Sequence, residues 1–262
     1  HTIVKLNPTL LGATELRSLL NDKHQWPTMV PDIAFEHDLK YNDALSIINN
    51  LEKAAEKKGV QFGLKLTNTL EVRNQKKVFD AKEKMMYLSG RALHPLSIHL
   101  ASKLQTEFKG RLDLSFSAGI EAFNIAEVLE CGLQPVTVSS DLLKPGGYSR
   151  MAQYAENIQK HLNENKQNSL RMLSEENRLI HLKKLQAYAQ KVSKNNAYSY
   201  SLFEQKNIKT KRPLHAFDCI AAPCVDTCPT SQNIPEYLHY AAQGEFQKSY
   251  EVILQNNAFP QT

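Results

Sequence analysis

The sequence predicts an α/β protein: a partial TIM barrel, then an α-helical linker, then the start of an α-helical domain. The main observation is that short apolar runs alternate with amphipathic stretches from residue 1 to about residue 150. Such alternation favours a parallel sheet with crossover helices. The second observation is length, because a complete eight-unit barrel needs about 250 residues. The region therefore has room for about five or six units, as the later portion of a barrel or as an open sheet.

The strand candidates are short runs of apolar residues bounded by polar ones. We expect strands at Ile3–Leu6, Gln61–Thr67, Met86–Leu88, Leu112–Phe116 and Pro135–Val138, with a weaker one near Met29–Phe35. The stretch Tyr41–Lys58 is amphipathic, because Leu45, Ile48 and Leu51 recur at helical spacing. It predicts one of the crossover helices.

Beyond residue 150 the pattern changes to long helices and then to a polar segment. Helices are expected at Tyr148–Leu162 and Glu175–Val192, and the apolar stripe of the second predicts a packing face. Residues 194–212 are polar, basic and rich in Asn and Ser, which is typical of a linker. We therefore expect barrel units over 1–150, a helical extension and basic linker over 151–212, and a helical domain over 213–262.

The net charge is +5, from 32 Lys and Arg against 27 Asp and Glu. Aromatic residues do not interleave with the basic clusters as they do in single-strand nucleic-acid binders, so nucleic-acid binding is not expected. The sequence lacks an apolar run long enough to span a membrane. It begins at His1 in a strand-like run, without a basic leader or an apolar signal core. We therefore expect an internal fragment of a larger cytoplasmic protein.

Three of the four cysteines, Cys219, Cys224 and Cys228, fall within ten residues. Tight clustering indicates metal binding, whereas scattered cysteines would indicate disulfides. Thiolates at this spacing can converge on an iron–sulfur cluster, and Pro229 after the last cysteine is typical of ferredoxin-like runs. A zinc site is less favoured, because its cysteines are usually paired as CxxC. Unligated thiols are the third interpretation.

The residues after the cysteines resemble a known iron–sulfur domain. The string CPTSQNIPEYLHYAAQGEFQKSYEVILQNNAFP is similar to the N-terminal domain shared by dihydropyrimidine dehydrogenase and the glutamate synthase small subunit. That resemblance implies two [4Fe–4S] clusters, with the clustered thiols as the last three of a run of four. Ala216 stands where the first cysteine should be, and His215 is a conceivable substitute. Further ligands would follow Thr262, so we expect no complete cluster within residues 1–262.

Several strings before residue 150 resemble the flavin-binding barrel of dihydroorotate and dihydropyrimidine dehydrogenases, among them KLNP, TNT, SGRAL and SAGI. That family holds FMN through a strand lysine, an Asn-Thr pair and glycine-bearing phosphate loops. The resemblance implies cofactor-binding roles for Lys5, Asn68, Thr69, Ser89, Gly90, Ser117, Gly119, Ser139 and Ser140. These strand ends are expected to face one cleft. The family usually has a second glycine where Ala118 stands, and we expect the Ala118 Cβ to crowd a phosphate and weaken FMN binding.

Longer strings, KLNPTLLG, FGLKLTNTLEV, YLSGRALHPLS and LLKPGGYSRM, together resemble the YgfK-type family of selenate reductase subunits over nearly the whole chain. In that family a dihydropyrimidine dehydrogenase-like barrel precedes the same iron–sulfur domain. The resemblance implies an oxidoreductase that moves electrons between iron–sulfur clusters and flavin, with other redox subunits or domains of the same chain as partners. Two alternatives stay open: a flavin-less barrel that docks the electron-transfer domain, and an aldolase with Lys5 or Lys65 as the Schiff-base lysine.

Two smaller features have their own interpretations. Glu36, His37 and Asp38 could bind a metal or move protons, or they could form a hydrogen-bond network within a loop. Cys131 precedes Gly132 at a predicted helix end, and we expect it to be a buried structural thiol.

Overall fold

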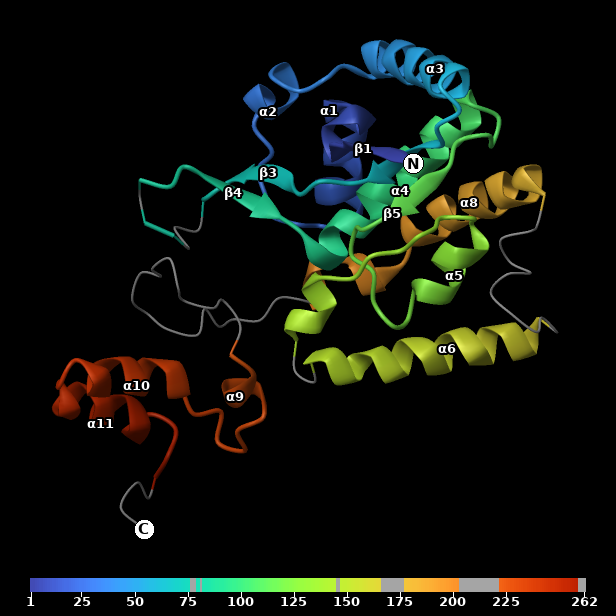
Figure 1. The fold of residues 1–262 in the computed structure, drawn as a ribbon. Coiled ribbons are helices and arrows are strands. Elements are labelled where there is room, and N and C mark those ends of the chain that lie inside the picture. The colour runs from blue at the N-terminus through green and yellow to red at the C-terminus, as the bar shows by residue number, and fades with distance from the viewer. Residues whose placement is uncertain (76–78, 81, 145–146, 166–176, 203–221, 259–262) are drawn as a thin grey trace. The chain divides into compact units, whose positions relative to one another are not determined.

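The structure is a computed structural model that describes residues 1–262 except 76–78, 81, 145–146, 166–176, 203–221 and 259–262 (Figure 1). The chain divides into two compact units. The barrel unit comprises His1–Arg73 and Met85–Phe203, and the second unit comprises Asn74–Lys84 and Glu204–Thr262. Each unit is described by itself below.

The barrel unit is built on a parallel sheet. Its strands are β1 (Thr2–Leu6), β2 (Phe62–Leu66) and β5 (Leu114–Phe116), in the order β1-β2-β5. Phe116 also forms an isolated parallel bridge with Val136, which extends the sheet in the same direction. The predicted strands near residues 3, 61 and 112 are therefore present, and they run parallel as successive βα units require.

The two faces of this sheet differ in chemistry because side chains alternate along a strand. Leu64, Leu66 and Phe116 are almost fully buried in the hydrophobic core. Their face packs against helix α4 (Leu93–Glu107), which is buried at ten of its fifteen positions. The intervening position on β2 is Lys65, so the opposite face of the sheet is polar at the carboxyl ends of its strands.

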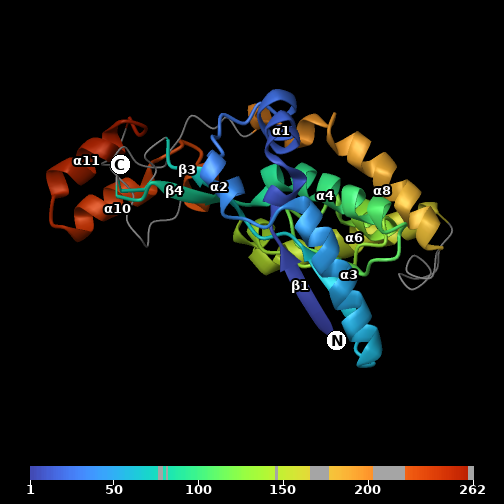
Figure 2. The same ribbon diagram turned by 90° about the horizontal axis from the view of Figure 1, so that it is seen from above.

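Further helices surround the sheet. Within the described residues, the α-helices of the barrel unit are α1 (Ala13–Arg17), α2 (Asp32–Glu36), α3 (Tyr41–Lys57), α4, α5 (Ile125–Glu130), α6 (Met151–Glu164) and α8 (Arg178–Val192). A π-helical turn covers Ser18–Lys23, and 3₁₀ turns cover Pro8–Leu11, Gly90–Ala92, Ser140–Leu143, Gly147–Arg150, Asn196–Tyr198 and Tyr200–Leu202. Helix α8 begins where the Asn177 side chain accepts a hydrogen bond from the Leu179 N–H at 2.8 Å. It runs alongside α4, as Figure 2 shows from above.

One strand prediction is wrong, and a second predicted strand is present but has a different partner from the one expected. The run near Met29–Phe35 contains helix α2, because Pro31 occupies the N-cap position with extended backbone and Asp32 follows in the first turn. Strand β4 (Met85–Leu88) exists, but it pairs antiparallel with β3 (Leu70–Arg73) in a separate two-stranded sheet. It is therefore the second strand of a hairpin and not a strand of the parallel sheet.

Two predicted segments also differ from the structure. The run Pro135–Val138 contributes only the bridge at Val136. The predicted linker is folded over its first part, since Tyr198 is only 1% exposed and belongs to the core. The remainder of that predicted linker, residues 203–212, lies outside the described residues.

The second unit contains a helical hairpin. Helices α10 (Ile234–Ala242) and α11 (Phe246–Leu254) pack against each other after the short helix α9 (Pro223–Asp226). Gly244 makes the turn between them at φ +77°, a backbone conformation that glycine adopts without strain. The Ser249 hydroxyl on α11 donates to the Tyr237 carbonyl on α10 at 2.8 Å. These contacts join the two helices predicted after the cysteines.

Candidate functional site

A cavity of about 390 Å³ opens at the carboxyl ends of the parallel strands. Its lining residues are Lys5, Lys65, Thr67, Thr69, Ser89, Gly90, Leu93, Ser117, Gly119, Ile120, Glu121, Thr137, Ser139, Ser140, Asp141 and Leu143. Carboxyl ends of parallel strands are where α/β folds place their ligands. A volume of roughly 300–1,000 Å³ is typical of small-molecule sites. The cavity is therefore the candidate site of the barrel unit.

The structure brings together most of the residues for which the sequence resemblance implies cofactor binding. Eight of them line the cavity: Lys5, Thr69, Ser89, Gly90, Ser117, Gly119, Ser139 and Ser140. Asn68 is the ninth and does not line it. The Asn68 side chain instead donates to the Asn7 side-chain oxygen at 2.6 Å, and its backbone N–H donates to the Leu6 carbonyl at 2.9 Å. The binding roles themselves stay predictions.

Gly119 is required by the geometry of the cavity wall. Its φ is +56°, in the left-handed region that side chains disfavour. A Cβ at this position would lie 2.4 Å from the Gly90 carbonyl oxygen and 3.0 Å from the Cβ of His94. The two glycine-bearing turns of the cavity thus touch through their backbones.

The crowding expected of the Ala118 Cβ is not found. Ala118 is fully buried in the hydrophobic core and is not one of the residues that line the cavity. Its Cβ therefore packs on the core side of the turn, and it does not narrow the space where an anion would lie. The carbonyl of Ala118 accepts a hydrogen bond from His94 Nδ1 at 2.8 Å.

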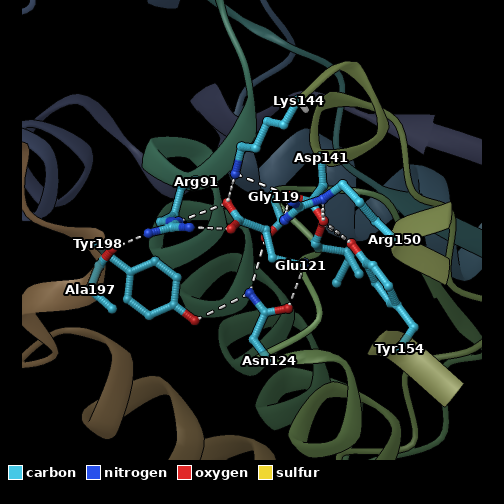
Figure 3. A network of polar contacts seen from close by, with 11 residues as sticks. Arg91, Gly119, Glu121, Asn124, Asp141, Lys144, Arg150, Tyr154, Ala197 and Tyr198 are labelled. Carbon is cyan, nitrogen blue, oxygen red and sulfur yellow. Dashed lines mark hydrogen bonds and ion pairs between the residues drawn. The ribbon is translucent and has the colours of Figure 1, made fainter. Parts of the chain in front are cut away.

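Two buried carboxylates in the cavity wall were not predicted as site residues. Glu121 accepts a bidentate interaction from Arg91, with Nε at 2.7 Å, and an ion pair from Lys144 at 2.9 Å (Figure 3). Lys144 also lies 3.0 Å from an oxygen of Asp141, so it bridges the two acids. Their positions in the sequence could have indicated them, because Glu121 and Asp141 closely follow the loops Ser117–Gly119 and Ser139–Ser140.

Asp141 is held in its charged form by its partners. Burial raises the pKa of Asp141, but hydrogen bonds from Tyr154, Arg150 and Lys144 outweigh burial and keep the pKa below its ordinary value. The Tyr154 hydroxyl donates at 2.7 Å and Arg150 Nη2 lies at 3.0 Å (Figure 3). Asp141 is therefore charged, and both acids of the wall are paired with basic side chains.

A buried ring cluster supports the Ala118–Gly119 turn from behind. His94 is completely buried, and burial lowers its pKa to about 4, so the ring is neutral at pH 7. Because Nδ1 lies against the Ala118 carbonyl, it carries the proton, and Nε2 accepts from the Tyr188 hydroxyl at 2.9 Å. The His94 ring also stacks on Tyr198, with centroids 5.0 Å apart and an interplanar angle of 5°.

The Tyr198 hydroxyl completes the same network. It lies 3.3 Å from the Tyr188 hydroxyl and accepts from Asn124 Nδ2 at 3.3 Å. Burial raises the pKa of Tyr198 to about 12. Asn124 Nδ2 also donates to the Gly119 carbonyl at 3.0 Å, so the turn is held at two successive carbonyls.

Within the cluster Glu36–Asp38, the Asp38 carboxylate belongs to a hydrogen-bond network, as the second of the two interpretations expects. Asp38 accepts from Asn7 Nδ2 at 2.9 Å and from Thr9 Oγ1 at 2.5 Å. Because Asn7 also accepts from Asn68, this network joins two loops that follow parallel strands. Within the described ranges of the chain, no group of three or more His, Cys, Asp or Glu side chains is placed to hold a metal ion.

The cysteine segment is described only in part. Cys219, together with His215 and Ala216, lies outside the described residues. Cys224 is exposed on α9, and Cys228 Sγ lies 3.4 Å from Thr230 Oγ1. Hydrogen bonds, first from the Thr230 hydroxyl and then from backbone N–H groups, lower the pKa of the Cys228 thiol, which favours the thiolate that binds metals.

Cys131 has the buried position expected of a structural thiol. It is 4% exposed in the barrel core, and burial raises its pKa above the ordinary thiol value. It is therefore an apolar packing residue without thiolate character.

Comparison with known families assigns the barrel unit. Residues 1–200 match the family described as "Oxidoreductase YgfK, N-terminal TIM-barrel domain". The chain belongs to this YgfK family. Residues 190–262 match the family described as "Dihydropyrimidine dehydrogenase domain II, 4Fe-4S cluster", which agrees with the first of the three interpretations of the cysteines. The TIM-barrel prediction is thereby confirmed.

Two curated relatives match over the whole length of the chain. Both are called "Putative oxidoreductase YgfK", one from Escherichia coli strain K12 and one from strain O157:H7, and each is 36% identical over 262 residues. The matches cover 99% of this chain but only 24% of each relative. No solved structure matches the chain. Of the helices that the structure describes, none is both long and apolar enough to cross a membrane.

Proposed function

We propose that this chain is part of an oxidoreductase that transfers electrons between [4Fe–4S] clusters and a flavin held in the barrel cavity. The observation that carries the proposal is that eight residues with predicted flavin contacts surround one cavity at the carboxyl ends of the parallel strands. A second support is the match of residues 190–262 to a 4Fe-4S domain in the same chain. A barrel site and an iron–sulfur domain joined in one polypeptide suit internal electron transfer.

The residues of the cavity fit FMN. A phosphate needs donors and close approach of the backbone, and the Gly90 and Gly119 turns offer both beside the hydroxyls of Ser117, Ser139 and Ser140. Lys5 supplies a positive charge at the end of β1. Flavin, when bound, supplies the chemistry that links two-electron substrates to one-electron clusters. The protein supplies binding, orientation and the charged wall of Glu121 and Asp141.

The cysteines Cys219, Cys224 and Cys228 are the proposed cluster ligands on this chain. A cubane needs four ligands, so remaining ligands would come from other parts of the protein. The proposed partners are other redox domains or subunits, and the proposed location is the cytoplasm. Selenate is a candidate electron acceptor because of the resemblance to selenate reductase-type subunits.

The test is an absorption spectrum of the anaerobically purified full-length protein, with iron, sulfide and flavin analysis. The proposal expects both flavin and iron–sulfur absorption, and bleaching of both on addition of a reductant. Iron–sulfur absorption without flavin would support the docking scaffold instead. Absence of both would refute the proposal. Activity with selenate is then measured by reoxidation of the reduced protein.

A further inference from the structure

Two lysines stand side by side on the polar face of the sheet. Lys5 of β1 and Lys65 of β2 are register partners in the parallel pair, so their side chains project from the same face of neighbouring strands. Both line the cavity. Neighbouring strands lie about 4.8 Å apart, and like charges placed directly across a strand pair destabilise a sheet.

The positive charge of this pair is not balanced within the described part of the chain. Lys65 Nζ donates to the neutral Thr137 hydroxyl at 2.7 Å, and Lys5 Nζ has no hydrogen bond or ion pair with the described residues. The two acids of the cavity wall already form ion pairs with other basic side chains. Glu121 is paired with Arg91 and Lys144, and Asp141 is paired with Lys144 and Arg150.

Other donors lie in the same cavity. Its lining includes the hydroxyl residues Thr69, Thr137, Ser139 and Ser140. Barrel interiors are usually filled by layers of branched apolar residues, whereas here the cavity lining carries amines and hydroxyls. These four hydroxyls and the two ammonium groups are a donor set for a multiply charged oxyanion.

We infer that Lys5 and Lys65 form a paired-lysine site for a tetrahedral oxyanion of charge −2, bound at the ends of β1 and β2. Each ammonium contributes one charge and several N–H donors, so the pair neutralises a dianion. The ligand is a free inorganic oxyanion or the phosphoryl group of a larger molecule. The inference deepens the proposed function and rests on it only for the location of the cavity, since flavin is not required for the anion to bind.

The competing interpretation is amine chemistry. A lysine beside another cation is a pattern also found in Schiff-base enzymes. The two interpretations differ in a simple respect, because an oxyanion site needs both charges and tolerates arginine, whereas an amine nucleophile is lost on substitution by arginine.

The experiment is a calorimetric titration of the purified, flavin-stripped protein with sulfate and with inorganic phosphate, at an ionic strength held constant with chloride. We expect saturable binding of one dianion, weakened about tenfold by Lys5→Met and by Lys65→Met, since a hydrogen bond to a charged group contributes about 1.5–3 kcal/mol. Lys65→Arg should retain binding. Lys53→Met, on the exposed face of α3, is the matched control and should bind as the unmodified protein does.

Competition between phosphate and FMN for the unmodified protein identifies the source of the anion. If phosphate competes with FMN but not with riboflavin, the site holds the phosphoryl group of the organic ligand. If phosphate and FMN bind together, the site holds a free oxyanion. Either result supports the paired-lysine site.

Three results would overturn the inference. They are the absence of saturable binding, equal binding by the Met variants and the Lys53 control, and borohydride trapping of a carbonyl adduct on Lys5 or Lys65. Circular dichroism on each variant excludes unfolding as the cause of a loss. Flavin content of the untreated protein is a separate measurement, so failure of the flavin proposal would not be mistaken for failure of this one.

Discussion

Replacing Gly119 by alanine tests whether the cavity wall depends on contact between two glycine turns. The added Cβ would meet the Gly90 carbonyl oxygen at 2.4 Å and the Gly90 carbonyl carbon at 2.9 Å. Both are backbone atoms, which cannot rotate away as the end of a side chain could. The residue is also in the left-handed region, at φ +56°.

The two effects add. Left-handed backbone in a residue with a Cβ costs about 1–2 kcal/mol, and inserting a carbon into a packed region costs about 1–3 kcal/mol. Gly119→Ala should therefore lower the free energy of unfolding by about 2–5 kcal/mol. For a unit of this size that corresponds to a fall in Tm of roughly 4–20 °C.

Gly59→Ala is the matched control, because Gly59 has nearly the same backbone conformation, φ +63°, with nothing within 4 Å of its added Cβ. It should lose only about 1–2 kcal/mol. Urea unfolding followed by Trp26 fluorescence measures both, since Trp26 is the single tryptophan and packs against the barrel core. Equal losses for the two variants would refute the argument from steric contact.

Three further predictions follow from the described contacts. His94 is neutral when folded, with a pKa of about 4 against about 6.5 in the unfolded chain. The neutral ring therefore contributes its full stability above pH 6.5, and the free energy of unfolding should fall by about 3 kcal/mol as the pH falls toward 4. His94→Gln should remove this contribution of His94 to the pH dependence of urea unfolding. Glu121→Gln removes the carboxylate charge that pairs with Arg91 and Lys144, and it should cost roughly 1–3 kcal/mol, because the acid is buried but its partners are partly exposed. Glu52→Gln, which breaks an exposed pair with Arg111, should cost under about 1 kcal/mol by the same assay. Cys224→Ser and Cys228→Ser should each lower the iron content of the anaerobically purified full-length protein, whereas Cys131→Ala should not, and equal iron in all three would refute the ligand assignment.

The parallel strands and α3 were predictable because each is encoded locally. Apolar alternation over Phe62–Leu66 and helical spacing over Tyr41–Lys57 determine the element without reference to the rest of the chain. The strand β4 was identified, but its partner was not. Whether a short apolar strand joins a parallel sheet or pairs in a hairpin depends on tertiary contacts, which the run Met85–Leu88 does not contain.

Residues of the candidate site were predictable where a sequence motif follows a strand. They were not predictable where a side chain forms an ion pair with a residue from a distant segment of the chain. Lys5, Ser117 and Gly119 follow parallel strands, and such strand ends meet at one edge. The ion-pair network of Glu121 joins residues 23 to 30 positions away, and no local pattern indicates such pairs. Ala118 was misjudged because its orientation depends on the turn, which places its methyl group in the core.

The burial of Tyr198 decides where the protein can be cut. The two family matches overlap over residues 190–200, so a boundary chosen from the second match alone would fall at residue 190. A barrel fragment that ends there would lose the ring that stacks on His94 and the carbonyl that accepts from Trp26 Nε1 at 2.9 Å. Independent expression of the barrel therefore requires the chain through Leu202, and an iron–sulfur fragment that starts at residue 190 would carry a piece of its neighbour's core.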